Sequence, residues 1–449
     1  MPRSGSSATR YHSIVIVGAG LSGLQAANKL LSKYPDLLLV EASSRVGGRV
    51  QQVEGIVPWP VQLGPEFVHG AKSSLKGLLQ EINCNLREFE WPDYWYFGAD
   101  RKLVSGSVKD EELERLHELF ASVGERPRPE PDISAREWLQ QEGASQRMLA
   151  VADACYANDF GCSLHQLGLS EMITENQRWD SGETYLILDR PLQAVVQHLH
   201  KLVVQNTQLG WPVSKIEYSS AGAKLHGPSG SVVECRHVIV TVPILMLQQE
   251  RIQFSPPLPT NKQGAISRVK MSNAMKVILA FSRPFWPADF FDVVCTDCFM
   301  PEFWVTQYPA TSSDPATAGL CCITGFVAGA AAEEMSCLSQ TTVVTRSLSQ
   351  LDQIFGTSER RHPATAAFVR AHVEDWSRSP YIGGAYSYPS LGARPGDRET
   401  LVAPVGDVLF FAGEATHPAV NPCMQAALET GERAAAQVLR ASKQIPSKL

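Results

Sequence analysis

Four residues near the N-terminus have the types and spacing needed to bind a dinucleotide. Gly18, Gly20 and Gly23 follow an apolar run that ends at Val17, and Glu41 follows a second apolar run, 18 residues after Gly23. In a strand–turn–helix–strand unit, the first glycine permits the tight turn, the second lets a pyrophosphate approach, and the third lets the helix pack closely. The helix N-terminus offers free N–H groups to phosphates, and the acid can accept hydrogen bonds from a ribose. The sequence therefore predicts a dinucleotide site here, against the alternative of an ordinary glycine-rich turn.

The residues after Glu41 distinguish between dinucleotides. The segment Arg45-Val46-Gly47-Gly48-Arg49 resembles the Gly-Gly-Arg extension of FAD-dependent oxidoreductases, which passes near the pyrophosphate. A simple NAD domain does not need such an extension. We therefore expect FAD rather than NAD, with Arg49 among its ligands; the alternative is an ordinary basic loop.

The elements that must position this site are spread along the chain. Apolar runs, turn residues and helical periodicity predict an α/β fold with a discontinuous, Rossmann-like FAD-binding domain and a second substrate-binding domain of mixed sheet plus helices. The expected FAD-binding domain comprises residues 11–75, 190–260 and 365–449, and the expected substrate-binding domain comprises residues 76–189 and 261–364. Within them we expect helices at 74–82, 108–123, 133–150, 337–355 and 424–440, a β-meander within 211–240, and strands at 275–281, 321–328 and 409–412.

Composition excludes several classes of partner. The net charge of −6 gives no basic footprint for nucleic acid. No apolar run reaches the roughly 18 residues needed to cross a membrane. The ten cysteines are scattered, and we expect reduced thiols, including Cys295 and Cys298, which form a C-x-x-C without a partner pair.

The two ends of the chain are expected to be flexible. Residues 1–10 form a polar leader without a signal core, and residues 441–449 form a polar tail. The tail ends in Ser447-Lys448-Leu449, a tripeptide that serves as a peroxisomal address at a free C-terminus. We therefore expect a peroxisomal protein that binds the import receptor, against the alternative of a chance match.

Several blocks together resemble the flavin-containing amine oxidases, a family that includes monoamine oxidases, polyamine oxidases and flavin-dependent histone demethylases. The resemblance extends from about residue 13 to residue 440. The blocks are the glycine turn with Arg45–Arg49, Leu63–Gly70, His237–Pro243, Lys270–Trp286, and Phe410–Thr416 with Ala427–Gly431. The first is shared by many FAD enzymes, whereas the last three together are specific.

The resemblance implies a catalytic role for Lys276. In the family, the lysine of this block holds a water against flavin N5, and a fixed cation there stabilises negative charge on the reduced flavin and on superoxide. The alternative is a strand lysine that faces solvent. The resemblance also implies that Glu414 contacts the ribityl or phosphate region, and that the backbones of Val213 and Met424 contact adenine and the isoalloxazine; core packing is a compatible alternative for the last two.

Two departures from the family pattern concern the flavin and its aromatic cage. Ala385 stands where monoamine oxidases carry the flavin-linking cysteine, so we expect non-covalent FAD. Tyr386 keeps one wall of the cage that aligns an amine, whereas Cys423 replaces the tyrosine of the second wall. This half cage argues against a monoamine oxidase proper but not against amine oxidation.

The substrate pocket is expected to contain acidic anchors if the substrate is a polycation. Asp159 falls where polyamine oxidases place a pocket carboxylate, and Glu66 and His69 lie in the loop that faces the flavin in that family. The resemblance implies that Asp159, Glu66 and Cys423 contact substrate and that His69 takes part in catalysis. A helix cap for Asp159 and satisfied loop polar groups for the other two are the alternatives.

The expected function is oxidation of an amine C–N bond of a polyamine or acetylated polyamine to an imine, with oxygen reduced to hydrogen peroxide. One alternative is an FAD oxidase or dehydrogenase of an amino acid or other small amine, in which Arg178 or Arg190 would pair with the carboxylate. A second alternative is a flavin-binding scaffold with little turnover.

Overall fold

The computed structural model describes residues 10–89, 91–182, 184–419 and 422–443. Its first sheet has the strand order β10-β2-β1-β13-β12-β11-β14, with β20 beside β13. These strands are β1 (Arg10–Val17), β2 (Leu38–Val40), β10 (Thr207–Gln208), β11 (Lys215–Ser219), β12 (Gly222–His226), β13 (Val232–Val240), β14 (Gln253–Ser255) and β20 (Leu409–Phe411). β10, β2, β1, β13 and β20 pair in parallel, whereas β11, β12 and β13 form the predicted antiparallel meander.

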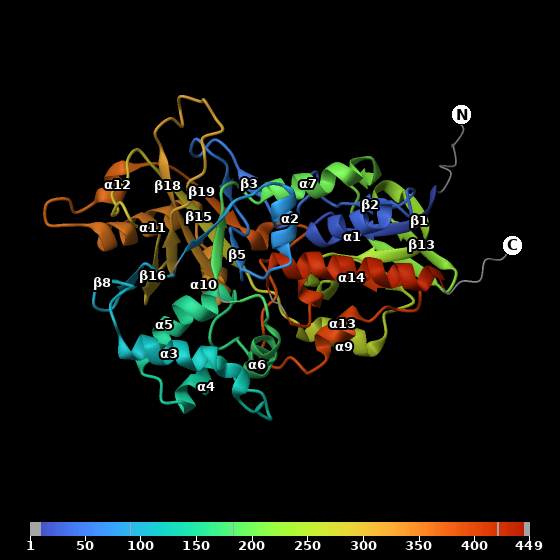
Figure 1. The fold of residues 1–449 in the computed structure, drawn as a ribbon, viewed down its shortest axis with the longest axis horizontal. Helices are drawn as coiled ribbons and strands as arrows, with labels where there is room; N and C mark the ends of the chain where they lie inside the picture. The colour runs from blue at the N-terminus through green and yellow to red at the C-terminus, as the bar shows by residue number, and fades with distance from the viewer. Residues whose placement is uncertain (1–9, 90, 183, 420–421, 444–449) are drawn as a thin grey trace.

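The first sheet is buried on both faces, so β1 is apolar without alternation. Ile14 and Ile16 belong to the core beneath the helices α1 (Leu21–Leu31), α7 (Gln193–Val203) and α14 (Met424–Lys443). Val15 and Val17 belong to the core on the opposite face. Figure 1 shows α1 and α14 side by side over this sheet, in the right half of the molecule.

The second sheet, on the left of Figure 1, has the order β19-β15-β18-β17-β16-β7-β8. Its strands are β7 (Tyr94–Phe97), β8 (Lys102–Ser105), β15 (Ala274–Phe281), β16 (Asp292–Thr296), β17 (Glu302–Trp304), β18 (Cys321–Ala328) and β19 (Phe368–Asp375). Met275, Val277 and Leu279 share a core with α10 (Gly329–Ser336), α11 (Gln340–Phe355) and α12 (Pro363–Ala367). Ile278 and Ala280 point the other way, into the core of the first sheet, so β15 joins the two units.

Smaller elements complete the fold. β5 (Phe67–His69), β9 (Tyr185–Leu188) and β6 (Leu86–Phe89) form a three-stranded sheet, and β3 (Gln52–Val53) pairs with β4 (Val61–Gln62). The lower layer of Figure 1 contains α3 (Glu111–Ala121), α4 (Ala135–Gln141), α5 (Gln146–Ala152) and α6 (Leu169–Arg178). The remaining helices are α2 (Leu75–Glu81), α8 (Ile244–Gln248), α9 (Thr260–Arg268) and α13 (Asp397–Val402).

The structure corrects three expectations about elements. The predicted helix 133–150 is two helices, because Gly143 ends α4 with a φ of +73°. Residues 441–443 are not a flexible tail but the last residues of α14, where Ala441 is buried and the Ser442 hydroxyl lies 3.2 Å from His237 Nε2. Arg10, expected in the leader, begins β1; residues 1–9 and 444–449 lie outside the described residues.

The domain limits remain predictions, with one finding that bears on them. β19 follows the predicted limit at residue 365 yet pairs with β15 in the second sheet. The ten cysteines are all unpaired. Within the described ranges, no helix is both long enough and apolar enough to cross a bilayer.

Asp292 of β16 is a fully buried acid in the second sheet. Its Oδ1 accepts a 2.6 Å hydrogen bond from the Asp93 N–H, and its Oδ2 has no partner among the described residues. Burial raises the pKa of this carboxyl to about 8, despite the bond from Asp93. The folded protein therefore holds Asp292 protonated at neutral pH.

We expect Asp292→Asn to flatten the pH dependence of stability. Between about pH 4 and about pH 8 the unfolded carboxyl is ionised while the folded one keeps its proton, so the wild-type free energy of unfolding falls as pH rises, by about 1.4 kcal/mol per pH unit for this group. Asparagine binds no proton in either state and removes that contribution. Urea unfolding between about pH 5 and about pH 7 measures both slopes; equal slopes would mean that Asp292 is ionised in the folded protein.

Candidate active site

The glycine turn after β1 is required by two different constraints. Gly18 has a φ of +106°, and a Cβ on Gly23 would lie 1.9 Å from the Gly18 carbonyl oxygen, so protein packing excludes side chains at both positions. A Cβ on Gly20 would meet nothing within 4 Å. The bare backbone at Gly20 therefore borders open space, as expected where a ligand approaches.

That open space is a cavity of about 910 Å³, a volume typical of cofactor sites. Five of the residues predicted to bind the cofactor line this cavity, namely Gly18, Gly20, Glu41, Arg49 and Val213. The carboxylate of Glu41 is fixed in the wall, because its Oε2 accepts a 2.8 Å bond from the Ala19 N–H and its Oε1 a 2.9 Å bond from the Ser43 N–H. The cavity and its donors therefore fit a dinucleotide. Gly23 is a packing residue behind it.

An ion pair joins the two ends of the chain at the rim of this cavity. Arg49 Nη1 lies 2.8 Å from Glu414 Oε1 and donates a second 2.8 Å bond to the Ala385 carbonyl. The other oxygen of Glu414 accepts a 2.6 Å bond from the Ser387 hydroxyl. Glu414 is therefore engaged by protein groups, and Arg49 is the member of the pair that reaches the cavity.

Lys276 is a buried cation on β15, not a solvent-facing strand lysine. Its Nζ lies 2.7 Å from Gly64 O, 2.7 Å from Glu66 Oε2 and 3.4 Å from Gln62 O. The Trp304 indole N–H donates a 2.8 Å bond to the same Glu66 oxygen. The structure thus places Glu66 against Lys276, and its contact with substrate remains a prediction.

The register of the second sheet brings a further acid onto the face of Lys276. Lys276 pairs with Phe326 on β18, and Phe326 pairs with Glu302 on β17. Directly paired residues point to the same face, so Glu302 lies two strand spacings, about 10 Å, from Lys276. Its Oε1 accepts a 3.0 Å bond from the Trp91 indole. Sequence analysis did not identify Glu302, because a single acid beside Phe303 and Trp304 is not a recognisable motif. Its relation to Lys276 follows only from the pairing of β15, β18 and β17.

Tyr386 and Asp159 are in contact. Tyr386, like Phe326, packs against a small cluster that contains Ala385, and its hydroxyl donates a 3.1 Å bond to the Asp159 carbonyl. Gly161 makes this approach possible, because it has a φ of +80° and a Cβ there would lie 2.2 Å from the tyrosine ring. The predicted residues Tyr386 and Asp159 are therefore brought together.

The acids of this region have raised pKa values. Burial raises the pKa of Asp159, opposed by the charge of His69, although the residue keeps exposed surface. Burial, followed by the charge of Asp159, raises the pKa of Glu302 to about 8. Burial, followed by the charge of Glu175, also raises the pKa of the Cys423 thiol, which Asp159 raises further. Cys423 is thus a buried neutral thiol near Asp159.

Aromatic side chains lie near Asp159 and Glu302, and two of them, Tyr386 and Trp91, donate hydrogen bonds to these residues. The His69 ring lies 5.2 Å from the Tyr185 ring, and the Trp91 and Tyr185 rings lie 5.8 Å apart. Trp304 lies 5.5 Å from Phe67 and 5.1 Å from the Lys276 ammonium. Aromatic faces attract cations, so rings and acids together suit a cationic amine. Met424, half-buried at the start of α14, packs in the core of the first sheet, and its contact with the flavin remains a prediction.

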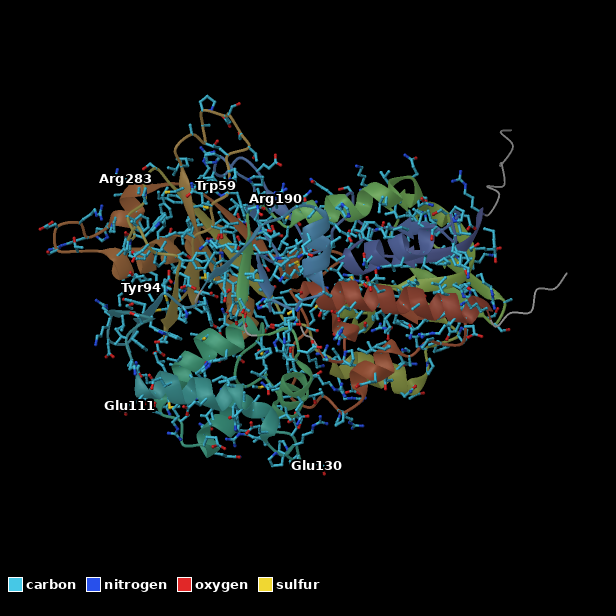
Figure 2. All side chains as sticks on the ribbon, viewed as in Figure 1. Trp59, Tyr94, Glu111, Glu130, Arg190 and Arg283 are labelled. Carbon is cyan, nitrogen blue, oxygen red and sulfur yellow. The ribbon has the colours of Figure 1, made fainter. Side chains whose placement is uncertain are left out.

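The two arginines that would favour an amino-acid substrate are already paired. Arg178 Nη1 lies 2.8 Å from Glu399 Oε1, and Arg190, labelled in Figure 2, pairs with Asp189 at 2.8 Å. Both side chains are more than 40% exposed. Neither is therefore a buried, uncommitted partner for a carboxylate.

Comparison with known proteins gives the family of the chain. The family model described as flavin containing amine oxidoreductase matches residues 21–439. The human "Peroxisomal N(1)-acetyl-spermine/spermidine oxidase" is 26% identical, with 95% of this chain and 94% of the relative covered. "Lysine-specific histone demethylase 1 homolog 2" of Arabidopsis thaliana is 28% identical, with 97% of this chain and 60% of the relative covered.

Solved structures confirm the predicted fold. Cyclohexylamine oxidase from Brevibacterium oxydans superposes with a TM-score of 0.83 at 19% identity, with 96% of this chain and 100% of that chain covered. A putrescine oxidase bound to putrescine gives 0.81 at 19% identity, with the same shares covered. The cofactor is FAD, in agreement with the family and with a cavity that fits a dinucleotide, and the methyl side chain of Ala385 offers it no sulfur for a covalent link.

We expect Gly20→Ala to weaken FAD binding while the protein stays folded, because the added methyl group enters the cavity and touches no protein atom. Gly23→Ala should instead destabilise the protein by about 1–3 kcal/mol, since its Cβ overlaps Gly18. The bound flavin absorbance of each purified variant and its melting temperature separate the two effects. Full flavin content in Gly20→Ala would place the pyrophosphate elsewhere.

Proposed function

The chain belongs to the flavin-containing amine oxidoreductases, and from this premise we propose that it oxidises a polyamine or acetylated polyamine. A C–N bond becomes an imine, which water hydrolyses, and oxygen is reduced to hydrogen peroxide. The observation that carries this proposal is a pair of neighbouring acids beside aromatic side chains: Asp159, bonded by Tyr386, and Glu302, which lies on the face of Lys276. A substrate with several ammonium groups matches more than one carboxylate.

Bound FAD supplies the hydride acceptor and passes the electrons to oxygen. The protein's part is to hold the amine in front of it. The reacting nitrogen must be neutral, because a protonated nitrogen has no lone pair to assist hydride loss. Tyr386 provides one aromatic wall for that nitrogen, while Asp159 and Glu302 bind the remaining charged nitrogens of the same chain.

The raised pKa of Glu302 adds a proton step to binding. The free enzyme holds Glu302 protonated at neutral pH, and pairing with an ammonium requires the carboxylate. Binding should therefore release a proton, and affinity should rise with pH up to about 8. Above about pH 10 it should fall again as free amines lose their charge.

We expect anaerobic mixing with spermine, spermidine or acetylated polyamines to bleach the flavin at lower concentration than monoamines or amino acids do. Glu302→Gln should raise the half-saturating polyamine concentration at least about tenfold, which corresponds to about 1.4 kcal/mol, and should abolish the rise in affinity towards pH 8. Stopped-flow absorbance over a pH series measures both quantities. Glu111→Gln, at the outer edge of α3 in Figure 2, is the matched control and should leave both unchanged.

The alternatives predict other outcomes of the same experiment. Preferential bleaching by an amino acid would favour the amino-acid oxidase, and a flavin that no amine bleaches would favour the scaffold. A Glu302→Gln variant with wild-type saturation would remove Glu302 from the polyamine site.

We also propose that the protein acts in peroxisomes. An import receptor would recognise Ser447-Lys448-Leu449 and direct the protein there. These residues lie outside the described ones, and the human relative named above is peroxisomal by its name. A fluorescent fusion that lacks the tripeptide should be cytosolic, whereas one that lacks only residues 444–446 should still be imported. Import without the tripeptide would disprove this address.

A further inference from the structure

The ammonium of Lys276 is fully occupied by one short segment of chain. An ammonium has three N–H donors, and the three acceptors within 3.4 Å are Gln62 O, Gly64 O and Glu66 Oε2. The Lys276 side chain is 6% exposed and that of Glu66 is 1% exposed. The pair is therefore removed from solvent, and its charge interaction is screened much less than that of an exposed pair.

The segment that holds Lys276 is itself rigidly held. A Cβ on Gly64 would lie 1.9 Å from the Arg49 carbonyl oxygen, and the Trp376 indole donates a 3.0 Å bond to Leu63 O. The Gln62 side chain accepts a 2.7 Å bond from the Leu192 N–H. Lys276 is thus fixed relative to Arg49, which lines the cofactor cavity.

Glu66 has no other partner for its charge than this lysine and the tryptophan beside it. Oε2 receives both Lys276 and the Trp304 N–H, while Oε1 is buried and without a partner among the described residues. A carboxylate meant for a substrate ammonium would present a free, accessible oxygen. The geometry of Glu66 is instead that of a counter-charge.

We propose that Glu66 is a positioning residue that fixes the Lys276 ammonium and cancels its charge beside the flavin, and that it does not bind substrate. The proposal rests on the proposed function and on the position next to flavin N5 that the family resemblance implies for Lys276. The protein then presents a neutral Lys276–Glu66 pair to the cofactor, not an isolated cation. Removing either partner changes the local charge by one unit, in opposite directions.

The test is a four-protein cycle of flavin midpoint potentials: wild type, Glu66→Gln, Lys276→Met and the double variant. A net positive charge stabilises the reduced, anionic flavin, so the potential of Glu66→Gln should become more positive. Lys276→Met leaves a lone carboxylate, and its potential should become more negative. The double variant should return towards the wild-type value. Titration with a chemical reductant and a reference dye needs no amine, so it is independent of the substrate.

The outcomes separate this inference from the proposed function. If the midpoint potential shifts in Lys276→Met but not in Glu66→Gln, the role of Glu66 is overturned. The same conclusion follows if Glu66→Gln keeps the wild-type potential but binds polyamine tenfold more weakly. An unchanged potential in Lys276→Met would instead place Lys276 away from the flavin. Failure of every amine to bleach the flavin would disprove the function but leave the charge cycle intact.

A second measurement, the melting temperature, tests the ion pair even in a variant that has lost FAD and has no flavin potential to measure. Removing one partner of a buried ion pair leaves the other charge uncompensated. The double variant should therefore melt at a higher temperature than Lys276→Met, whatever its flavin content. Melting temperatures that fall additively across the four proteins would show that Glu66 and Lys276 do not act as a pair.

Discussion

The Arg49–Glu414 ion pair is the contact on which the arrangement of the site depends. It links the loop after β2 to the strand end at β20, and both partners also bind the segment that carries Tyr386, through Ala385 O and the Ser387 hydroxyl. Three distant parts of the chain are thus fixed at one point. The Arg49 carbonyl lies against Gly64, so the same point also sets the segment that holds Lys276.

Buried charge is distributed unevenly around that point. On the cofactor side, Arg49 and Lys276 each have a carboxylate as partner, so their charges are compensated within the protein. Farther along the second sheet, Asp292 and Glu302 form no ion pair within the part of the chain that the structure describes, and burial raises the pKa of each to about 8. Buried charge is therefore compensated by ion pairing on the cofactor side and by a retained proton farther along the second sheet.

Sequence reasoning recovered what depends on neighbouring residues and missed what depends on register. The glycine turn, Glu41, the meander and β15 were predictable, since spacing and apolar periodicity specify them locally. Glu302 could not be found, because its relation to Lys276 passes through Phe326 on a third strand. Glu66 was expected to face substrate, yet the turn of the segment at Gly64 directs it to Lys276 and Trp304. β19 pairs with β15 of the second sheet although it follows the predicted domain limit at residue 365, because a strand's sequence does not reveal which sheet edge it joins.

The late position of β20 and α14 in the chain has a consequence for biosynthesis. β20 pairs with β13 and α14 packs on α1, so the first sheet and its helical layer stay incomplete until the last tenth of the chain appears. Arg49 and Glu414 are 365 residues apart. At ordinary elongation rates this separation corresponds to roughly 20 to 70 seconds on the ribosome. The N-terminal strand, turn and helix therefore remain only partly covered through that interval, and the nucleotide cradle closes at the end of synthesis.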